Sequence, residues 1–381
     1  MKWFGILRYF YLLGAANALF FSMLIFSKPR RNLADKLLGF WLIILSLQLL
    51  FPFLYLADIE TYYKFAGYEV IFYAVHPLLL YLYIRAMTGQ FPSGGKLTTI
   101  LLIAGLTEIA VLTFFILPAK ERLNLILGKE PISVIYYLIF IPVFIYFTSF
   151  FAYSIRALKN YKSNVLQVYS YKENVDLLWL SRLVFLFYGL LVLFLPLAVI
   201  FYLNQISVAE SDYFYFAGLT FFIFFIGYWG YRQGEVFNLQ VGLESDANYH
   251  EININKTPIT KNLKGKAMEL KQLMEQKQPY LNPTLTIFEL AKLIDMQPHQ
   301  LSKLINKEFG CNFFEYINRY RIESFKKCML ENKFKDFTLL GVAFECGFNS
   351  KSAFNRIFKE QTGLTPGEFR KQHLNSNVLI N

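Results

Sequence analysis

Apolar and polar positions divide the chain into two parts with different patterns. Between Trp3 and Tyr231, stretches of about 20 residues with few charges recur seven times. Each is long enough to cross a hydrocarbon core roughly 30 Å thick at a helical rise of about 1.5 Å per residue. From Asn238 onward the sequence is charged, and its apolar residues recur at helical spacing. The pattern predicts a membrane module followed by a soluble one.

Short polar loops separate the seven predicted transmembrane helices. We expect them, to within a few residues, at 4–26, 37–57, 65–87, 97–117, 132–155, 177–203 and 213–231. The first is too long for a signal peptide and has no small-residue cleavage site after it, so we expect it to stay as a helix. Composition agrees, since hydrophobic residues make up 55% of the 381 residues and charged residues only 17%.

Basic residues are concentrated in the loops that follow odd-numbered spans. The loop after the first span carries Lys28, Arg30, Arg31 and Lys36, and the loop after the fifth carries Arg156, Lys159, Lys162 and Lys172. The loop after the sixth span has none, and only the loop after the fourth span blurs the pattern. Because cytoplasmic loops hold the excess of Lys and Arg, we expect a multi-pass protein of the cytoplasmic (inner) membrane, with its N-terminus outside and its C-terminal domain in the cytoplasm.

A polar cytoplasmic linker, 232–280, separates the membrane module (1–231) from a C-terminal domain (281–374). A linker helix is predicted from about Thr260 to Gln278, because apolar residues recur there at helical spacing. These residues are Leu263, Ala267, Leu270, Leu273 and Met274. Such a stripe is able to pair across a dimer or to pack on its own domain, and the sequence leaves both interpretations open.

Two short helices joined by a tight turn are predicted at the start of the C-terminal domain. Thr286 and Glu289 have the spacing of a capping box, which satisfies the unpaired amides at a helix start, so a helix should run from there to Asp295. After a break at 296–298, a second helix should end at Gly310, a residue suited to a left-handed cap. Such a pair is a helix-turn-helix unit.

The same pattern returns 52 or 53 residues later. Matching positions are Ala291 and Ala343, Asp295 and Gly347, Lys303 and Arg356, Leu304 and Ile357, and Gly310 and Gly363. Asp and Gly match at the turn because both tolerate a left-handed backbone. Between the copies, 312–330 predicts one long amphipathic helix. Its apolar residues should pack on both units: Phe314, Ile317, Ile322 and Phe325.

A further helix start follows the second unit. Thr365 suits the N-cap, Pro366 suits the first helical position, and Glu368 completes another capping box. Because Gly363 should end the preceding helix, we expect this short segment to be architectural and to hold that helix in place.

Residues 281–373 are similar to the DNA-binding domain of the AraC/XylS-type transcriptional regulators. The resemblance is carried at fixed spacing by Ala343, Gly347, Phe348, Ser350, Phe354, Arg356, Phe358, Lys359, Gly363, Thr365, Pro366, Phe369 and Arg370. It covers about a quarter of the chain. It implies seven helices, with two helix-turn-helix units joined by a long helix, and binding to double-stranded DNA. Asp295 at the first turn and Gly367 after the proline depart mildly from the family pattern.

A helix that reads the major groove presents polar side chains to base edges on one face and apolar anchors on the other. The predicted buried face consists of Leu301, Leu304, Ile305, Phe354, Ile357 and Phe358. The candidates for base contacts are His299, Gln300, Ser302, Lys303, Lys351, Ser352, Asn355 and Arg356. Phosphate contacts position a protein without reading sequence, and the candidates are Lys307, Lys359, Arg370 and Lys371.

The net charge of the C-terminal domain does not by itself indicate that it binds DNA. Residues 281–374 hold 14 Lys and Arg against 10 Asp and Glu, a surplus of four, and a helical protein–protein adaptor with solvated charges would look similar. The repeated caps and turns are what favour DNA binding. The predicted fold is all-α: an N-terminal bundle of seven transmembrane helices and a C-terminal seven-helix domain with two helix-turn-helix units.

Other chemistry has little support in the sequence. Cys311, Cys328 and Cys346 fall in the part expected in the reducing cytoplasm, without a CxxC pair, and the four histidines are scattered. We therefore expect free thiols, no metal and no cofactor. The soluble part has no phosphate loop, nucleophile elbow or paired carboxylates, so we do not expect an enzyme.

Ionisable residues inside the spans are costly and are therefore candidates for function. His76 and Glu108 lie at similar depth in the third and fourth spans, and Arg8 and Glu69 both lie toward the outer face. Either pair would line a pocket or a polar network in a sensor bundle. The alternative interpretation is that these residues only hold helices together.

Two classes of function fit these observations. The first is a membrane-bound one-component bacterial transcription factor, whose sequence-specific DNA binding is regulated by a signal sensed in or at the membrane. The alternative is a transporter or channel-like membrane protein with a cytoplasmic regulatory domain, but the spans have no obvious internal repeat or pair of broken helices. The first class implies as partners double-stranded DNA, membrane lipid, a second copy in a homodimer, RNA polymerase and a small-molecule or membrane-derived signal.

Overall fold

In the computed structural model the chain forms two compact units. The N-terminal unit combines residues 1–159 with 177–243, and the C-terminal unit combines 160–176 with 244–381. The structure describes residues 2–58, 61–62, 70–112, 134–172, 175–203, 208–232, 263–330 and 337–378. Within these residues every regular element is a helix, apart from an isolated bridge between Tyr169 and Thr286. The predicted all-α class is confirmed.

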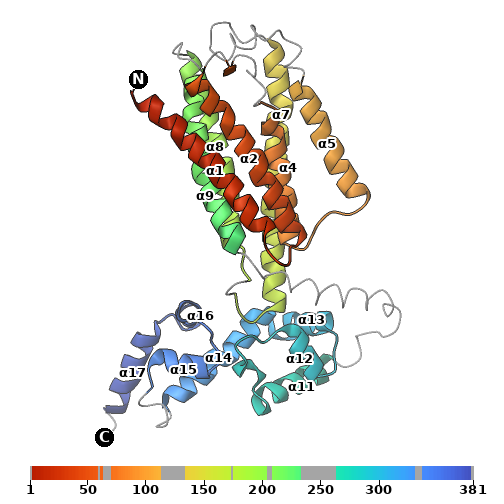
Figure 1. The fold of residues 1–381 in the computed structure, drawn as a ribbon. Coiled ribbons are helices and arrows are strands. Elements are labelled where there is room, and N and C mark those ends of the chain that lie inside the picture. Colours follow the sequence, from red (N-terminus) through yellow and green to blue (C-terminus); the bar gives the residue numbers. More distant parts are fainter. Residues whose placement is uncertain are drawn as a thin grey trace. The chain divides into compact units, whose positions relative to one another are not determined.

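Long helices run side by side in the N-terminal unit (Figure 1). They are α1 (Lys2–Phe26), α2 (Leu33–Ala57), α4 (Val70–Met87), α5 (Gly95–Leu112), α7 (Val134–Val168), α8 (Leu178–Leu203) and α9 (Val208–Arg232). Each overlaps one of the predicted spans. Among the described residues, three segments are long and apolar enough to cross a membrane: Ile6–Phe26, Leu33–Ala57 and Tyr213–Arg232. The seven-span topology and its orientation stay predictions.

Helix α1 packs against both α2 and α9, while α8 packs on α9 and α4 packs on α2. The helices approach closely at Gly14, where a Cβ atom would lie 2.8 Å from the side chains of Leu49 and Thr220. A larger residue there would push against α2 and α9 at once. A separate cluster joins α4, α5 and α7 through Tyr81, Leu82, Ala104, Tyr146 and Phe150.

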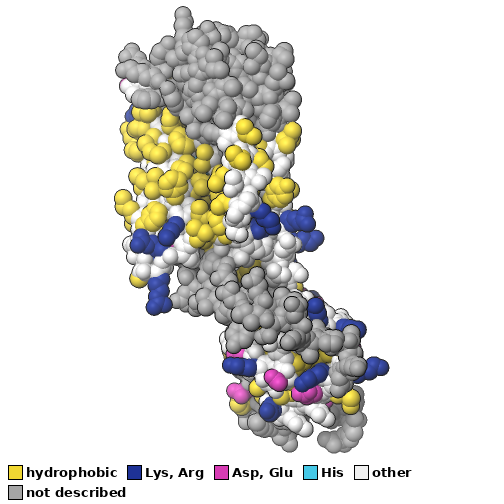
Figure 2. Space-filling model, turned by 90° about the vertical axis from the view of Figure 1, so that its right-hand side faces the viewer, with side chains coloured by type: hydrophobic (Ala, Val, Ile, Leu, Met, Phe, Trp, Pro, Cys, Tyr) yellow, Lys and Arg dark blue, Asp and Glu magenta, His cyan; other side chains and the backbone are white. Residues whose placement is uncertain are grey.

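The outer surface of the N-terminal unit is apolar. Figure 2 shows hydrophobic side chains spread over its face, with Lys and Arg side chains gathered toward one end of that area. Large apolar side chains that are more than half exposed occur on several helices, among them Phe20, Phe40, Leu102, Leu193 and Phe221. A soluble monomer rarely exposes so much contiguous apolar surface, so this surface suits contact with lipid.

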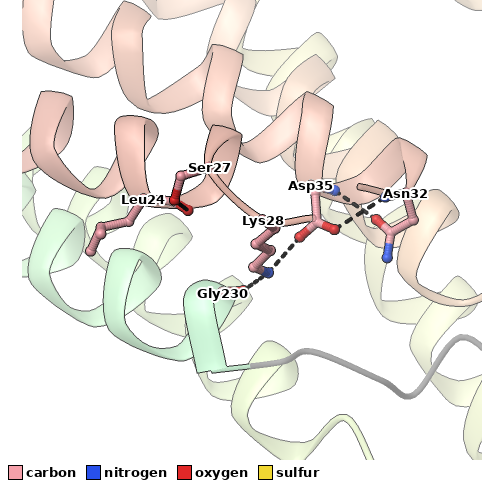
Figure 3. A network of polar contacts seen from close by, with 6 residues as sticks. All are labelled: Leu24, Ser27, Lys28, Asn32, Asp35 and Gly230. Carbon is pink, nitrogen blue, oxygen red and sulfur yellow. Dashed lines mark hydrogen bonds and ion pairs between the residues drawn. The ribbon is translucent and has the colours of Figure 1, made fainter. Parts of the chain in front are cut away.

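A polar network ties the adjoining ends of α1, α2 and α9 (Figure 3). Lys28 Nζ lies 2.6 Å from Asp35 Oδ1 and 3.4 Å from the carbonyl oxygen of Gly230, in the last turn of α9. Asp35 also completes a capping box with Asn32 at the start of α2. The side chains of Lys28 and Asp35 are only 14% and 8% exposed, so the ion pair is largely buried.

The C-terminal unit contains short helices that follow the predicted pattern. They are α11 (Leu263–Gln276), α12 (Ile287–Leu293), α13 (Pro298–Phe309), α14 (Phe313–Leu330), α15 (Leu339–Glu345), α16 (Lys351–Thr362) and α17 (Pro366–Val378), with a 3-10 turn at Pro279–Leu281. The apolar stripe of α11 packs in the same core as α12 and α13. Of the two interpretations of this helix, packing on its own domain is the one found within the chain.

Helix α14 joins two hydrophobic cores. Ile317 belongs to the core around α11, α12 and α13, whereas Phe314, Ile322 and Phe325 belong to the core around α15 and α16. This confirms the prediction that the long helix packs on both helix-turn-helix units. Because both cores lie along one continuous helix of 18 residues, α14 fixes the separation of the two helix-turn-helix units within the C-terminal domain.

Candidate nucleic-acid interface

The first helix-turn-helix unit consists of α12 and α13. At its start, the Thr286 amide donates to Glu289 Oε2 (2.7 Å), and Thr286 Oγ1 accepts from the Glu289 amide (3.3 Å), which confirms the predicted capping box. The turn passes through Asp295 with φ of 50°, and α13 ends at Gly310 with φ of 64°. Both left-handed positions were predicted. The anchors Leu301, Leu304 and Ile305 are fully buried, as expected for the inner face of a reading helix.

The second unit, α15 and α16, repeats this geometry. Gly347 at the turn has φ of 88°, and Gly363 at the end of α16 has φ of 77°. Ser350 caps α16 by accepting a hydrogen bond from the Ala353 amide (3.1 Å), and Thr338 caps α15. The predicted anchors of α16 are buried as well: Phe354, Ile357 and Phe358. Neither cap was predicted, although Ser and Thr directly before apolar-periodic residues are typical signals for a helix start.

On α13 the candidate base contacts differ in exposure. His299 and Lys303 are exposed, whereas Gln300 and Ser302 are half-buried. The Ser302 hydroxyl donates to Gln167 Oε1 at 2.8 Å, so this candidate is engaged by the last turn of α7. That contact has no signal in the local sequence, because the two residues are 135 positions apart.

On α16 all four candidate base contacts are exposed: Lys351, Ser352, Asn355 and Arg356. Arg356 Nη1 lies 3.1 Å from both carboxylate oxygens of Glu360, one turn further along the helix. An exposed pair of this spacing is worth only about 0.3–0.5 kcal/mol, so Arg356 can exchange Glu360 for a base edge at little cost.

Most of the candidate phosphate contacts are exposed side chains. Lys307, Lys359 and Lys371 are exposed, and Arg370 is half-buried.

The predicted capping box at the start of α17 is present, because the Thr365 amide donates to Glu368 Oε2 at 2.7 Å and Thr365 Oγ1 accepts from the Glu368 amide. Hydrogen bonds from Thr365 hold the pKa of the Glu368 carboxyl below its usual range.

Helix α14 carries a buried arginine that was not among the predicted functional residues. Arg321 on α14 is 2% exposed, and its Nε donates to the carbonyl of Tyr280 at 2.8 Å. Its other nitrogens donate to Ser170 and to the carbonyl of Asn282. A signal was available, since Arg321 follows Ile317 by four positions and therefore shares its buried helix face.

The candidate sensor residues are described only in part. His76 Nδ1 accepts from Trp41 Nε1 at 3.0 Å, and its Nε2 lies 2.7 Å from Gln48 Oε1, with all three side chains buried. Arg8 Nη2 donates to the neighbouring Tyr9 hydroxyl at 2.8 Å. Glu69 and the side chain of Glu108 lie outside the described part of the chain, so the two predicted pairs stay predictions.

Within the described ranges, no group of three or more His, Cys, Asp or Glu residues is arranged to hold a metal ion. Cys311 and Cys346 are buried free thiols, and Cys328 is a half-buried one. Cys346 Sγ lies 3.8 Å from Cys328 Sγ in the core of the second unit.

Residues 290–372 match the family described as a helix-turn-helix domain. The uncharacterized transcriptional regulatory protein YesN of Bacillus subtilis is 38% identical over 93 residues, which are 24% of this chain and 25% of that protein. The uncharacterized HTH-type transcriptional regulator YijO of Escherichia coli is 34% identical over 89 residues, which are 23% and 30% of the two chains. The regulatory protein PocR of Salmonella typhimurium is 26% identical over 109 residues, which are 29% and 35%.

The chain thus spans only about a third or less of these curated relatives. A solved structure of a protein of unknown function from Listeria innocua is 29% identical, covering 26% of this chain and 92% of that one, with a TM-score of 0.23. The family match and the curated relatives show that residues 290–372 form a helix-turn-helix domain similar to those of HTH-type transcriptional regulators.

Proposed function

We propose that the chain is a membrane-anchored one-component transcription factor, in which α13 and α16 read specific DNA sequences and a signal in or at the membrane regulates that reading. The observation that carries this proposal is the repeated unit. Two helix pairs have the same left-handed turn, the same left-handed end and the same buried anchors, and both are mounted on α14. Two such helices about one DNA turn apart, roughly 34 Å, would enter successive major grooves.

Within this proposal the exposed side chains divide into two groups. Arg356 and Lys303 are our leading base readers, because a guanidinium or ammonium can bind the acceptor edge of guanine. Lys307, Lys359, Arg370 and Lys371 would contact phosphates and so hold the register without reading sequence. The domain would act as part of a homodimer and contact RNA polymerase. Because the stripe of α11 is used in its own core, the dimer contact would lie elsewhere.

The membrane anchoring rests on the apolar surface of the N-terminal unit and on its basic loops. All seven predicted spans would cross the inner membrane, with Lys28, Arg30, Arg31 and Lys36 on the cytoplasmic side. His76, Glu108, Arg8 and Glu69 are the candidates for sensing. His76 supports this role best, since its buried partner Gln48 has an amide nitrogen without a hydrogen-bond partner among the described residues.

The test is selection of DNA by the full chain in lipid nanodiscs. Random duplexes are bound, washed at about 0.15 M salt and sequenced. The proposal expects an enriched motif with two conserved blocks whose centres are about 10 base pairs apart. Binding without an enriched motif, with an affinity that falls steeply with salt for every sequence, would contradict it, because phosphate contacts alone give that behaviour.

A further inference from the structure

The end of α7 and the turn after it belong to the DNA-binding domain. Residues 160–176, which we call the strap, cluster with the C-terminal helices and not with the helices of the N-terminal unit. Helix α7 enters the strap without a break and ends at Val168. The Tyr161 hydroxyl donates to the carbonyl of Val175 at 2.7 Å, which closes the strap across its two ends.

Ser170 anchors the strap to the domain. Its carbonyl accepts from Arg321 Nη1 (3.0 Å) and from Asn318 Nδ2 (3.1 Å), and its hydroxyl accepts from Arg321 Nη2 (3.0 Å). The Ser170 amide donates to the carbonyl of Leu285 at 3.2 Å. A guanidinium that is 2% exposed needs all its acceptors, so losing the strap would leave the charge of Arg321 incompletely solvated. The strap is therefore a built-in part of the domain.

The strap also lies against the reading helix α13, and its Leu166 packs on the hydrophobic core to which α16 contributes. Gln167 Oε1 accepts from Ser302 Oγ (2.8 Å) and from Asn306 Nδ2 (3.0 Å), two side chains one turn apart on the same face of α13. Beyond Ser170, Lys172 lies 4.5 Å from the ring centre of Phe314. Burial and the nearby Arg356 guanidinium of α16 lower the pKa of the Lys172 ammonium. Hydroxyl and amide groups of this kind are the ones that bind base edges, and here they are occupied.

We infer that the strap is autoinhibitory: Gln167 competes with DNA for Ser302 and Asn306, and α7 passes movement of the membrane helices to this contact. The inference rests on the proposed function and adds its regulation. Ser170, two residues beyond the end of α7, is the fixed point, and Gln167, in the last turn of α7, is the gate. A rotation of α7 would therefore withdraw Gln167 from α13 while the anchor at Arg321 stays intact.

Charge gives the inference a distinctive signature. In the strap, Lys162 and Lys172 balance Glu173 and Asp176. The strap does not imitate the negative charge of DNA, so it inhibits by occupying hydrogen-bonding groups. Its removal from α13 should change the affinity for DNA without changing the slope of log K against log salt, because the number of phosphate contacts stays the same.

Three variants of the full chain in nanodiscs test the inference on the selected DNA. Gln167→Ala removes the acceptor and should tighten binding roughly three- to tenfold, the equivalent of one or two neutral hydrogen bonds. Gln167→Glu keeps an acceptor for Ser302 and Asn306 and adds a charge that repels phosphate, so it should weaken binding. Asn164→Ala, at an exposed position on the same helix, is the matched control and should bind like the original chain.

The outcomes separate the two proposals. If Gln167→Ala, Gln167→Glu and Asn164→Ala bind DNA with equal affinity and an enriched motif is still recovered, autoinhibition by the strap is overturned and the proposed function stands. Absence of sequence-specific binding in every variant overturns both. If Gln167→Ala tightens DNA binding and Gln167→Glu weakens it, a general loss of stability cannot be the cause, because it would weaken DNA binding in both variants.

A cross-link gives a second measurement. In Gln167→Cys with Asn306→Cys, a short cleavable bifunctional thiol reagent should join the two positions, reduce the affinity for DNA at least tenfold, and restore it after cleavage. Prior binding of DNA should slow the reaction. Cross-linked protein that binds DNA with unchanged affinity would overturn the inference, as would failure of the two positions to react in the absence of DNA.

Discussion

Asp295 and Gly347 occupy equivalent turn positions in the two helix-turn-helix units, and both have a left-handed backbone, with φ of 50° and 88°. Their surroundings differ. A Cβ atom on Gly347 would lie 2.4 Å from the carbonyl oxygen of Tyr280 and 3.0 Å from Leu281, which are backbone neighbours that cannot rotate away. The first turn tolerates a side chain, whereas the second excludes one for two independent reasons, backbone conformation and space.

Replacement of Gly347 by Ala should therefore destabilise the second unit by about 2–4 kcal/mol, the sum of left-handed strain and overpacking. Hydrogen exchange of the full chain, followed by mass spectrometry, should show faster exchange in α15 and α16. Asp295→Gly is the matched control. It relieves strain and adds backbone freedom, so its effect should stay within about 1 kcal/mol. Equal losses in both variants would show that the contact with Tyr280 does not matter.

These turns also show how far the sequence could predict the structure. The caps at Thr286 and Thr365, the left-handed ends at Gly310 and Gly363, and the buried faces of the reading helices depend on residues within one helix or turn, and their spacing alone indicates them. The contacts of Gln167 with Ser302 and of Ser170 with Arg321 join residues 135 and 151 positions apart. No local pattern encodes such contacts, so the strap could not be predicted from the sequence.

Arg356 and Lys359 on α16 should contribute differently to DNA binding. Arg356→Ala should cost about 1–3 kcal/mol and relax the preference at one base position, because a bidentate base contact is lost. Lys359→Ala should weaken binding to all DNA sequences alike and reduce the slope of log K against log salt by about 1. Binding of the selected motif and of its single-base variants at several salt concentrations measures both effects.

The partner of Arg356 supplies a control for this prediction. Glu360→Gln releases the guanidinium from an exposed pair, so binding should become slightly tighter with the same base preference. If Arg356→Ala weakened every sequence to the same degree as Lys359→Ala, Arg356 would be a phosphate contact and the assignment of base readers on α16 would be wrong.

The buried pair of Lys28 and Asp35 should stabilise the joined ends of α1, α2 and α9. Lys28→Met leaves a largely buried carboxylate without its cation and should cost about 3–5 kcal/mol, whereas Lys28→Met with Asp35→Asn should cost less than that single change. Thermal unfolding in nanodiscs, followed by tryptophan fluorescence, measures the difference. Arg30→Met, at an exposed position of the same loop, should change stability by less than about 0.5 kcal/mol. A double variant as unstable as Lys28→Met would contradict this account.

The thiol of Cys346 should resist alkylation until the pH is very high. Burial raises the pKa of the Cys346 thiol to about 12. Because the thiolate is the reactive form, roughly one thiol in ten thousand is ionised at pH 8, and the rate of labelling should rise about tenfold per pH unit up to that pKa. The raised pKa also means that stability is constant below the pKa of the unfolded thiol and falls as pH rises above it. Labelling by iodoacetamide, located by mass spectrometry, tests this, with the denatured chain as the control; rapid labelling of the folded chain at pH 8 would contradict it.

The hydrogen bonds of His76 offer the most direct test of sensing in the N-terminal unit. Trp41 packs with its ring centre 6.1 Å from Phe187 and 5.7 Å from Phe222, and it donates to His76 Nδ1. The donated bond leaves the proton on Nε2, which donates to Gln48. Trp41→Phe keeps an aromatic ring but removes the donor, so it should cost about 1–3 kcal/mol by leaving a buried acceptor unpaired.

If this network transmits the signal, Trp41→Phe and His76→Ala should both change transcription from a reporter that carries the selected DNA motif. Phe187→Leu is the control, because it disturbs the same aromatic cluster without touching a hydrogen bond. A network that only holds helices together predicts that all three variants change reporter output in proportion to their loss of stability. A sensing network predicts that Trp41→Phe and His76→Ala depart from that proportion while Phe187→Leu follows it. Thermal unfolding and reporter output measured on the same three variants therefore decide between the two roles.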